Sequence, residues 1–138
     1  MKNRYLVTGG SGLLGTNWSI NLRKNNKVYS TLNKRKIYID GIEYININFL
    51  SIENLQKKLK KIKPIILLHT AALSDVDECE KNKKETYDVN VKITENIVKI
   101  CNKLDIKLVF ISTDHIFNGR SKMLDENQPK DPINYYVK

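Results

Sequence analysis

Short apolar segments alternate along the chain with longer segments in which apolar residues have helical spacing. The segments expected to be strands are Tyr5–Thr8, Val28–Leu32, Tyr44–Ile47, Ile65–His69 and Lys107–Ile111. The segments expected to be helices are Leu13–Asn25, the stretch from the capping residue Ser51 to Pro64, and the stretch from about Lys84 to Leu104. This alternation predicts βαβ units, and therefore an α/β fold with a parallel sheet of about five strands.

The apolar spacing within each predicted helix also predicts the face that the helix buries. Leu14, Trp18 and Leu22 should place the first helix on the sheet. The buried residues of the other two helices should be Ile52, Leu55, Leu59 and Ile62, and then Val91, Ile97, Val98 and either Cys101 or Leu104. After Thr113 the pattern changes, and Asn118–Gly119 with the proline-containing segment Asp125–Pro132 predicts an ordered loop.

Length and composition are those of one domain, or part of one, with a core of its own: the chain has 138 residues, 41% of them hydrophobic. No apolar stretch is long enough to cross a bilayer, and Met1–Arg4 leads directly into the first predicted strand, so we expect a cytoplasmic protein with no membrane partner. Cys79 and Cys101 have the spacing of neither a zinc site nor a disulfide framework, so we expect free thiols and no metal.

The formal net charge of +9 raises the question of a nucleic-acid partner. The lysines, however, are spread through every segment together with many asparagines and isoleucines, and no aromatic platform or recognition helix accompanies them. We therefore expect no nucleic-acid partner. A positive field would instead attract an anionic dinucleotide and a nucleotide-linked sugar.

The most informative segment is the glycine-rich turn Val7–Gly15, which lies between the first predicted strand and the first predicted helix. Its glycines have the spacing of a dinucleotide-binding turn, whether counted as Gly10, Gly12 and Gly15 or as Gly9, Gly12 and Gly15. Glycine is needed where the chain turns sharply, approaches a diphosphate and packs the helix on the strand. We therefore expect a Rossmann domain with a doubly wound sheet, whose dinucleotide contacts Gly9, Ser11, Gly12, Leu13, Leu14 and Gly15.

The end of the second predicted strand indicates which dinucleotide is bound. A carboxylate there would accept the ribose 2′-hydroxyl of NAD, whereas basic residues accommodate the 2′-phosphate of NADP. The strand is followed by Asn33, Lys34 and Arg35, with no acidic residue before Asp40. Because a guanidinium grips phosphate with two donors, we expect these residues to favour NADP(H) over NAD(H).

Further segments resemble the extended short-chain dehydrogenase/reductases, and among them the dTDP-4-dehydrorhamnose reductase family. Thr8 opens the glycine turn as in that superfamily, and His69–Ala72 is similar to its Asn-Ala-Ala segment, where small residues let the cofactor approach. Val76–Glu80 resembles the reductases' Val-Asp-x-Ala-Glu segment, and Val89–Val91 their Val-Asn-Ala helix. The resemblance adds these residues to the expected cofactor site: Thr70, Ala71, Ala72, Asn90 and Ser112.

The sharpest resemblance is in Ile111–Gly119, which is similar to that family's Ser-Thr-Asp-Tyr-Val-Phe-x-Gly, and Glu126 and Pro132–Tyr136 follow in the family's order. It implies NADPH-dependent reduction of a nucleotide-linked 4-keto-6-deoxysugar, the substrate and partner we expect. Tyr136 would donate a proton to the ketone, and Thr113 would hydrogen-bond the same oxygen. The family places a lysine four residues after the tyrosine, where a cation lowers the pKa of a phenol that is otherwise near 10.

Because the sequence ends at Lys138, that lysine would lie beyond it for Tyr136, and also for Tyr135, the other candidate proton donor. The spacing after the Pro-x-Asn motif favours Tyr136. We expect residues 1–138 to be a Rossmann domain cut off at the start of the helix that carries the catalytic tyrosine. It would lack the C-terminal substrate lobe and would be inactive alone.

The sequence departs from the family's pattern at His69 in place of asparagine, His115 in place of tyrosine, Asn48 in place of aspartate and Val137 in place of glycine. We expect His69 to be a hydrogen-bonding residue at a strand end, and His115 to pack against or line the pocket rather than act as a base. Two other functions stay open: a sugar-nucleotide epimerase or dehydratase of the same superfamily that retains its cofactor, and a regulatory subunit that binds NADP without turnover. The oligomeric state, a homodimer included, also stays open.

Overall fold

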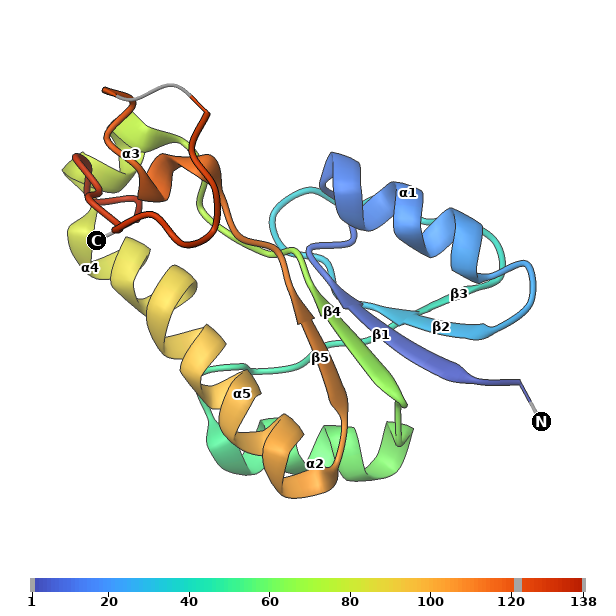
Figure 1. Cartoon of the computed structure of the whole chain (residues 1–138). Coiled ribbons are helices and arrows are strands. Elements are labelled where there is room, and N and C mark those ends of the chain that lie inside the picture. The colour runs from blue at the N-terminus through green and yellow to red at the C-terminus, as the bar shows by residue number, and fades with distance from the viewer. Residues whose placement is uncertain (1, 121–122, 138) are drawn as a thin grey trace.

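Five short parallel strands form the centre of the protein, whose computed structural model describes residues 2–120 and 123–137 (Figure 1). The strands are β1 (Arg4–Thr8), β2 (Lys27–Ser30), β3 (Ile42–Tyr44), β4 (Ile66–His69) and β5 (Lys107–Phe110). Their order in the sheet is β3-β2-β1-β4-β5. The strand order therefore reverses between β1 and β4, which confirms the predicted α/β fold and places a crevice at the carboxyl ends of these two strands.

Helices cover both faces of the sheet (Figure 1). On one face α1 (Leu13–Leu22) contacts β1 and β2, and on the other α2 (Ile52–Ile62) packs against α5 (Ile93–Leu104). Successive residues of a strand point to opposite faces, so Leu6 joins the core beneath α2 and α5 while Val7 joins a smaller core beneath α1. Because both faces of β1 and β4 are buried, their side chains form nearly continuous apolar runs.

The buried face of α1 differs from the predicted one. Leu14 and Trp18 are 40% and 38% exposed, whereas Gly15 and Ser19 are buried, and of the predicted residues Leu22 alone packs on the core beneath α1. The reason is the glycine turn: the Gly15 backbone lies so close to the Gly9 carbonyl that a side chain at position 15 would collide with it. This close approach turns the small residues of α1, rather than its large ones, toward the sheet.

The predicted helix from about Lys84 to Leu104 is a succession of segments: α4 (Lys83–Thr86), the π-helical turn η1 (Tyr87–Lys92) and α5. A π-helical turn inserts an extra residue and so changes which residues face the core. Ile97, Ile100 and Cys101 are buried, whereas the predicted Val98 is 39% exposed. The prediction of buried Val98 was therefore wrong, and Ile100 takes its place.

Other helix and strand boundaries differ from the predicted ones by a few residues. The third strand is Ile42–Tyr44 instead of Tyr44–Ile47, because the ladder with β2 ends where Ser30 pairs with Tyr44, and Ile47 then enters the core. The sequence did not predict α3 (Val76–Lys81), whose amino end is capped by the Asp75 side chain. The segment from 117 to 137 is an irregular loop in its described part, after the short 3-10 helix η2 (Asp114–Ile116), as expected. Met1, at the start of the segment before the first predicted strand, and Lys138, the last residue, lie outside the described residues.

Candidate functional site

The glycine turn follows β1 at the centre of the sheet and packs against the segment after β4. Gly9 has a φ of +70°, and a Cβ atom placed on it would lie 2.9 Å from the Cα atom of Ala71. The turn is closed by hydrogen bonds from the Gly12 N–H to the Gly9 carbonyl (3.0 Å) and from the Gly10 N–H to the Thr31 carbonyl (2.9 Å). Glycine is therefore required at position 9 for both its backbone angle and its close approach to Ala71.

The amino end of α1 carries no side-chain cap. Its N-cap residue is Gly12, and its first turn contains no acidic residue. The amino ends of α2 and α3 are instead capped by the side chains of Ser51 and Asp75, and both have acidic residues in the first turn. The first N–H groups of a helix need partners and carry partial positive charge. The amino end of α1 therefore has the donors that suit a diphosphate.

Two cavities flank this turn at the carboxyl ends of the strands. The first, which we call the turn cavity, has a volume of about 300 Å³ and is lined by Gly9, Ser11, Thr31, Leu32, Asn33, Ile45, Asn46, Ile47, Asn48, Phe49, Leu50, Ala71, Val89 and Ile93. The second, the tyrosine cavity, also has about 300 Å³ and is lined by His69, Thr70, Ala71, Ala72, Asn90, Val91, Thr94, Phe110, Ile111, Ser112, Thr113, Ile116, Tyr136 and Val137. Ala71 lines both, so a single crevice can hold a ligand that is longer than either cavity.

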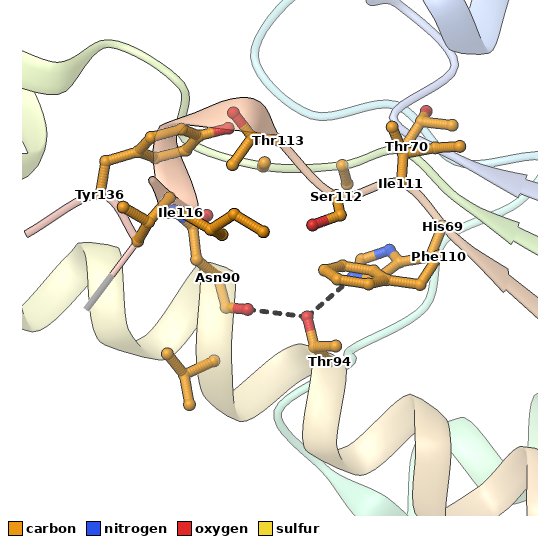
Figure 2. Close-up of a pocket in the computed structure, with 14 residues that line it drawn as sticks. His69, Thr70, Asn90, Thr94, Phe110, Ile111, Ser112, Thr113, Ile116 and Tyr136 are labelled. Atoms are coloured by element: carbon orange, nitrogen blue, oxygen red, sulfur yellow. Dashed lines mark hydrogen bonds between the residues drawn. The ribbon is translucent and has the colours of Figure 1, made fainter. Parts of the chain in front are cut away.

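Thr113 and Tyr136, the predicted catalytic residues, both line the tyrosine cavity, and Figure 2 shows the Tyr136 hydroxyl directed toward Thr113. Thr113 is the N-cap of η2, where its hydroxyl oxygen accepts a hydrogen bond from the His115 N–H (3.2 Å). The Tyr136 ring lies edge-on to the exposed His115 ring, with 5.8 Å between centroids. His115 thus packs against the tyrosine, as expected.

The neighbouring Tyr135 lies outside the tyrosine cavity. Its backbone N–H donates to Glu80 Oε1 (2.6 Å), and its ring lies 5.4 Å from Lys83 Nζ, so it is directed toward α3 and α4. Of the two tyrosines weighed from the sequence, Tyr136 is the one that lines the crevice.

His69 is buried at the end of β4, and both its ring nitrogens have hydrogen-bond partners. Nδ1 lies 2.7 Å from Thr8 Oγ1, and Nε2 lies 3.1 Å from Thr94 Oγ1. Burial lowers the pKa of His69 to about 4, so the ring is neutral at physiological pH. The expectation of a hydrogen-bonding residue at the strand end is confirmed.

The remaining predicted cofactor residues occupy different positions around the crevice. Gly9, Ser11 and Asn33 line the turn cavity, and Thr70, Ala71, Ala72, Asn90 and Ser112 line the tyrosine cavity. Gly12, Leu13, Leu14 and Gly15 form the start of α1 and line neither cavity, and Lys34 and Arg35 are exposed on the loop after β2. The Asn90 amide is already bonded to the Leu73 backbone, at 2.8 Å to its N–H and 2.9 Å to its carbonyl.

Sequence reasoning missed several lining residues, among them Thr94, Phe110 and Phe49. Thr94 lies one helical turn after Asn90, so the i, i+4 spacing was a signal that pointed to it. Phe110 lies at the end of β5, next to His69, with 5.7 Å between ring centroids. Phe49 lies in an irregular stretch before α2, and no local pattern in the sequence marks it as a lining residue.

The two thiols lie in the core, away from solvent. Cys79 and Cys101 are free and buried, as predicted, and burial raises the pKa of the Cys101 thiol to about 11. Within residues 2–120 and 123–137, no group of histidine, cysteine, aspartate and glutamate side chains could hold a metal ion. In the same ranges no helix has both the length and the apolar character needed to cross a membrane.

Comparison with known proteins relates this chain to sugar-nucleotide enzymes. The model of the RmlD substrate binding domain family matches residues 3–138. A hypothetical dTDP-4-dehydrorhamnose reductase from Sulfolobus tokodaii is 32% identical, with a TM-score of 0.88 over 97% of this chain and 48% of that one. The dTDP-4-dehydrorhamnose reductase from Bacillus anthracis, solved in complex with NADP, is 29% identical, with a TM-score of 0.84 over 99% of this chain and 46% of that one.

A curated relative of another kind is methionine adenosyltransferase 2 subunit beta from Xenopus laevis, which is 26% identical over 142 residues. The match covers 98% of this chain and 40% of the relative. The chain therefore spans less than half the length of these relatives. Solved structures that share the fold include complexes with NADP and with NAD.

Proposed function

Because the chain belongs to the RmlD substrate binding domain family, a branch of the extended short-chain dehydrogenase/reductases, we propose that it is the dinucleotide-binding part of an NADPH-dependent reductase. Its substrate class is a nucleotide-linked 4-keto-6-deoxysugar. The observation that carries the proposal is the crevice in which the glycine turn and the Thr113–Tyr136 pair lie on either side of Ala71. A dinucleotide and a ketone can meet only where a phosphate site and a proton donor share one opening.

The residues around the crevice fit a dinucleotide in one orientation. The uncapped amino end of α1 would hold the diphosphate, and the turn cavity with Asn33 would hold the adenosine half. The tyrosine cavity would then hold the nicotinamide and the sugar ketone, with Thr70, Ala71 and Ala72 as a wall of small residues. This assignment uses the crevice at the reversal of strand order, where ligands of doubly wound sheets bind.

In this reaction the protein itself would supply a proton and hold the substrate's ketone group in position. Bound NADPH supplies the hydride. Tyr136 donates its phenolic proton to the ketone oxygen, and the Thr113 hydroxyl donates a hydrogen bond to the same oxygen. Phe110, Ile111 and Ile116 contribute apolar side chains to the lining of the same cavity.

Two outcomes in solution test the reductase proposal. The whole reductase of which this chain is proposed to be the dinucleotide-binding part, incubated with NADPH and a dTDP-linked 4-keto-6-deoxysugar, should consume NADPH, and reduced sugar should appear in equal amount. Protein that is isolated with tightly retained NAD, and that interconverts nucleotide sugars with no net use of added dinucleotide, would instead be an epimerase or dehydratase. That outcome would contradict the reductase proposal.

Arg35 provides a test of the NADPH preference. It is exposed on the loop after β2, two residues beyond Asn33, which lines the turn cavity. Replacing it with alanine should weaken NADPH binding by about tenfold and leave NADH binding within about twofold, because in this proposal the guanidinium would contact only the 2′-phosphate. Isothermal titration measures both affinities.

Lys36→Ala is the matched control, since it removes an equally exposed positive charge one residue further along the loop. It should change the affinity for NADPH by less than about twofold. Equal losses for NADPH and NADH in Arg35→Ala, or equal losses in both variants, would rule out a specific phosphate contact at Arg35.

A second candidate function is that of a regulatory subunit that binds dinucleotide without turnover. The likeness to methionine adenosyltransferase 2 subunit beta favours it. The two functions differ in one measurable respect: a regulatory subunit would bind NADPH in the titration, yet would not consume it with any nucleotide-linked ketosugar.

A further inference from the structure

Residues from four elements form a hydrogen-bond chain along the wall of the tyrosine cavity: the side chains of Thr8, His69 and Thr94, and the backbone carbonyl of Asn90. Thr8 ends β1, His69 ends β4, Asn90 belongs to η1, and Thr94 lies in the first turn of α5. Thr8 Oγ1 lies 2.7 Å from His69 Nδ1, His69 Nε2 lies 3.1 Å from Thr94 Oγ1, and the Thr94 hydroxyl donates to the backbone carbonyl of Asn90 at 2.7 Å. Figure 2 shows the last two of these contacts in the floor of the tyrosine cavity.

The neighbouring backbone groups fix the direction of each hydrogen bond. Thr8 Oγ1 accepts the N–H groups of both Thr70 and Ala71, each at 3.2 Å, so its own proton is left for His69 Nδ1. A neutral imidazole that accepts at Nδ1 carries its proton on Nε2, which then donates to Thr94 Oγ1. The Thr94 proton goes to the Asn90 carbonyl. The direction of every hydrogen bond in this series is therefore determined, and the neutral His69 ring carries its proton on Nε2.

The two ends of this series of hydrogen bonds hold the same stretch of backbone, residues 70–73. At one end Thr8 Oγ1 accepts hydrogen bonds from the Thr70 and Ala71 N–H groups, and the Thr70 hydroxyl donates to the Thr8 backbone carbonyl at 2.6 Å. At the other end, Thr94 bonds the backbone of Asn90, and the side-chain amide of the same residue accepts from the Leu73 N–H and donates to the Leu73 carbonyl. This stretch contains Ala71, the residue that lines both cavities, and it packs against Gly9 of the turn.

We propose that His69 is a positioning residue: through Thr8 and Thr94 it joins the two anchors of residues 70–73 and so sets the width of the crevice where the turn cavity meets the tyrosine cavity. His69 does this without contacting the reacting atoms. Its effect on a dinucleotide rests on the proposed function, whereas its effect on the order of residues 70–73 does not.

The test uses Thr94, because its replacement breaks the chain without leaving a large hole in the core. Thr94→Val keeps the shape of the side chain and removes the acceptor for His69 Nε2, whereas Thr94→Ser keeps the hydroxyl. The matched control is Thr86→Val, since Thr86 is buried at the end of α4, before the π-helical turn, and its hydroxyl donates to the carbonyls of Cys79 and Asn82, away from the crevice.

Residue-resolved hydrogen exchange and NADPH titration of the intact protein provide the measurements. In Thr94→Val we expect exchange of the Ala71 and Leu73 amides to accelerate by roughly tenfold, and NADPH binding to weaken by roughly tenfold. Thr94→Ser should restore both quantities to within about twofold of the wild type, and Thr86→Val should leave both within about twofold even where it lowers the melting temperature. Nitrogen NMR of the wild type should show His69 protonated on Nε2 and not on Nδ1.

Two results would overturn the positioning role. One is unchanged exchange of the Ala71 and Leu73 amides in Thr94→Val, and the other is a proton on His69 Nδ1 in the wild type. If the wild type bound no NADPH, the proposed function would fail instead, and the exchange rates of Ala71 and Leu73 would still decide the role of His69.

Discussion

In the whole reductase, replacing Tyr136 with phenylalanine should lower the rate of NADPH-dependent ketone reduction by at least about 100-fold, while NADPH affinity stays within about twofold of the wild type. The phenylalanine ring would still fill the tyrosine cavity and pack edge-on to His115, so only the proton donor is lost. The measurement is the turnover rate at saturating NADPH and sugar, together with NADPH binding by titration.

Tyr135→Phe is the matched control for this experiment. Tyr135 is the adjacent residue, but its ring lies over Lys83 and its backbone N–H is bonded to Glu80, outside the tyrosine cavity. Its substitution should change the turnover rate by less than about twofold. If instead Tyr135→Phe abolished turnover and Tyr136→Phe did not, the catalytic role would belong to Tyr135.

The free energy of unfolding should fall by about 3 kcal/mol between pH 6.5 and pH 4 because of His69 alone. Burial lowers the pKa of this histidine from 6.5 to about 4 in the folded protein. As the pH falls below 6.5, His69 in the unfolded chain takes up a proton that the folded protein does not bind, so acid favours unfolding. The loss is complete near pH 4, below which both states are protonated at His69.

Carboxylates also titrate over this range, so the contribution of His69 is measured by difference. Denaturant unfolding at a series of pH values should give a shallower dependence for His69→Asn than for the wild type. An NMR titration of the wild type is an independent check, and protonation of His69 near pH 6.5 would contradict the prediction.

Part of the site was predictable because local sequence patterns reflect local geometry. A glycine turn between a strand and a helix has the same backbone requirements wherever it occurs, so Gly9–Gly15 could be assigned without knowledge of the rest of the chain. Thr113 and Tyr136 came from a resemblance between motifs, and the structure places both in one cavity. Lys34 and Arg35 were assigned from their charge and position, and they lie beside the turn cavity rather than in it.

Other features depended on contacts between distant residues. The apolar spacing of α1 pointed to Leu14 and Trp18, but the closeness of Gly15 to Gly9 turned the opposite face to the sheet. The π-helical turn at Tyr87–Lys92 changed which residues of the long helical stretch are buried. The Asn90 side chain, which belongs to this turn, accepts a hydrogen bond from the Leu73 N–H. Helical periodicity does not contain this information, because an ideal repeat assumes an unbroken helix.

The sequence by itself determined the alternation of strands and helices, the parallel sheet and the position of the glycine turn, since each depends on residues that are neighbours along the chain. Only the tertiary structure decided the partners of His69 and the meeting of the two cavities at Ala71. Thr8 and His69 are separated by 61 residues, and His69 and Thr94 by 25. Such pairs meet because the strand register and the packing of α5 on the sheet bring them together, and no spacing along the chain encodes that contact.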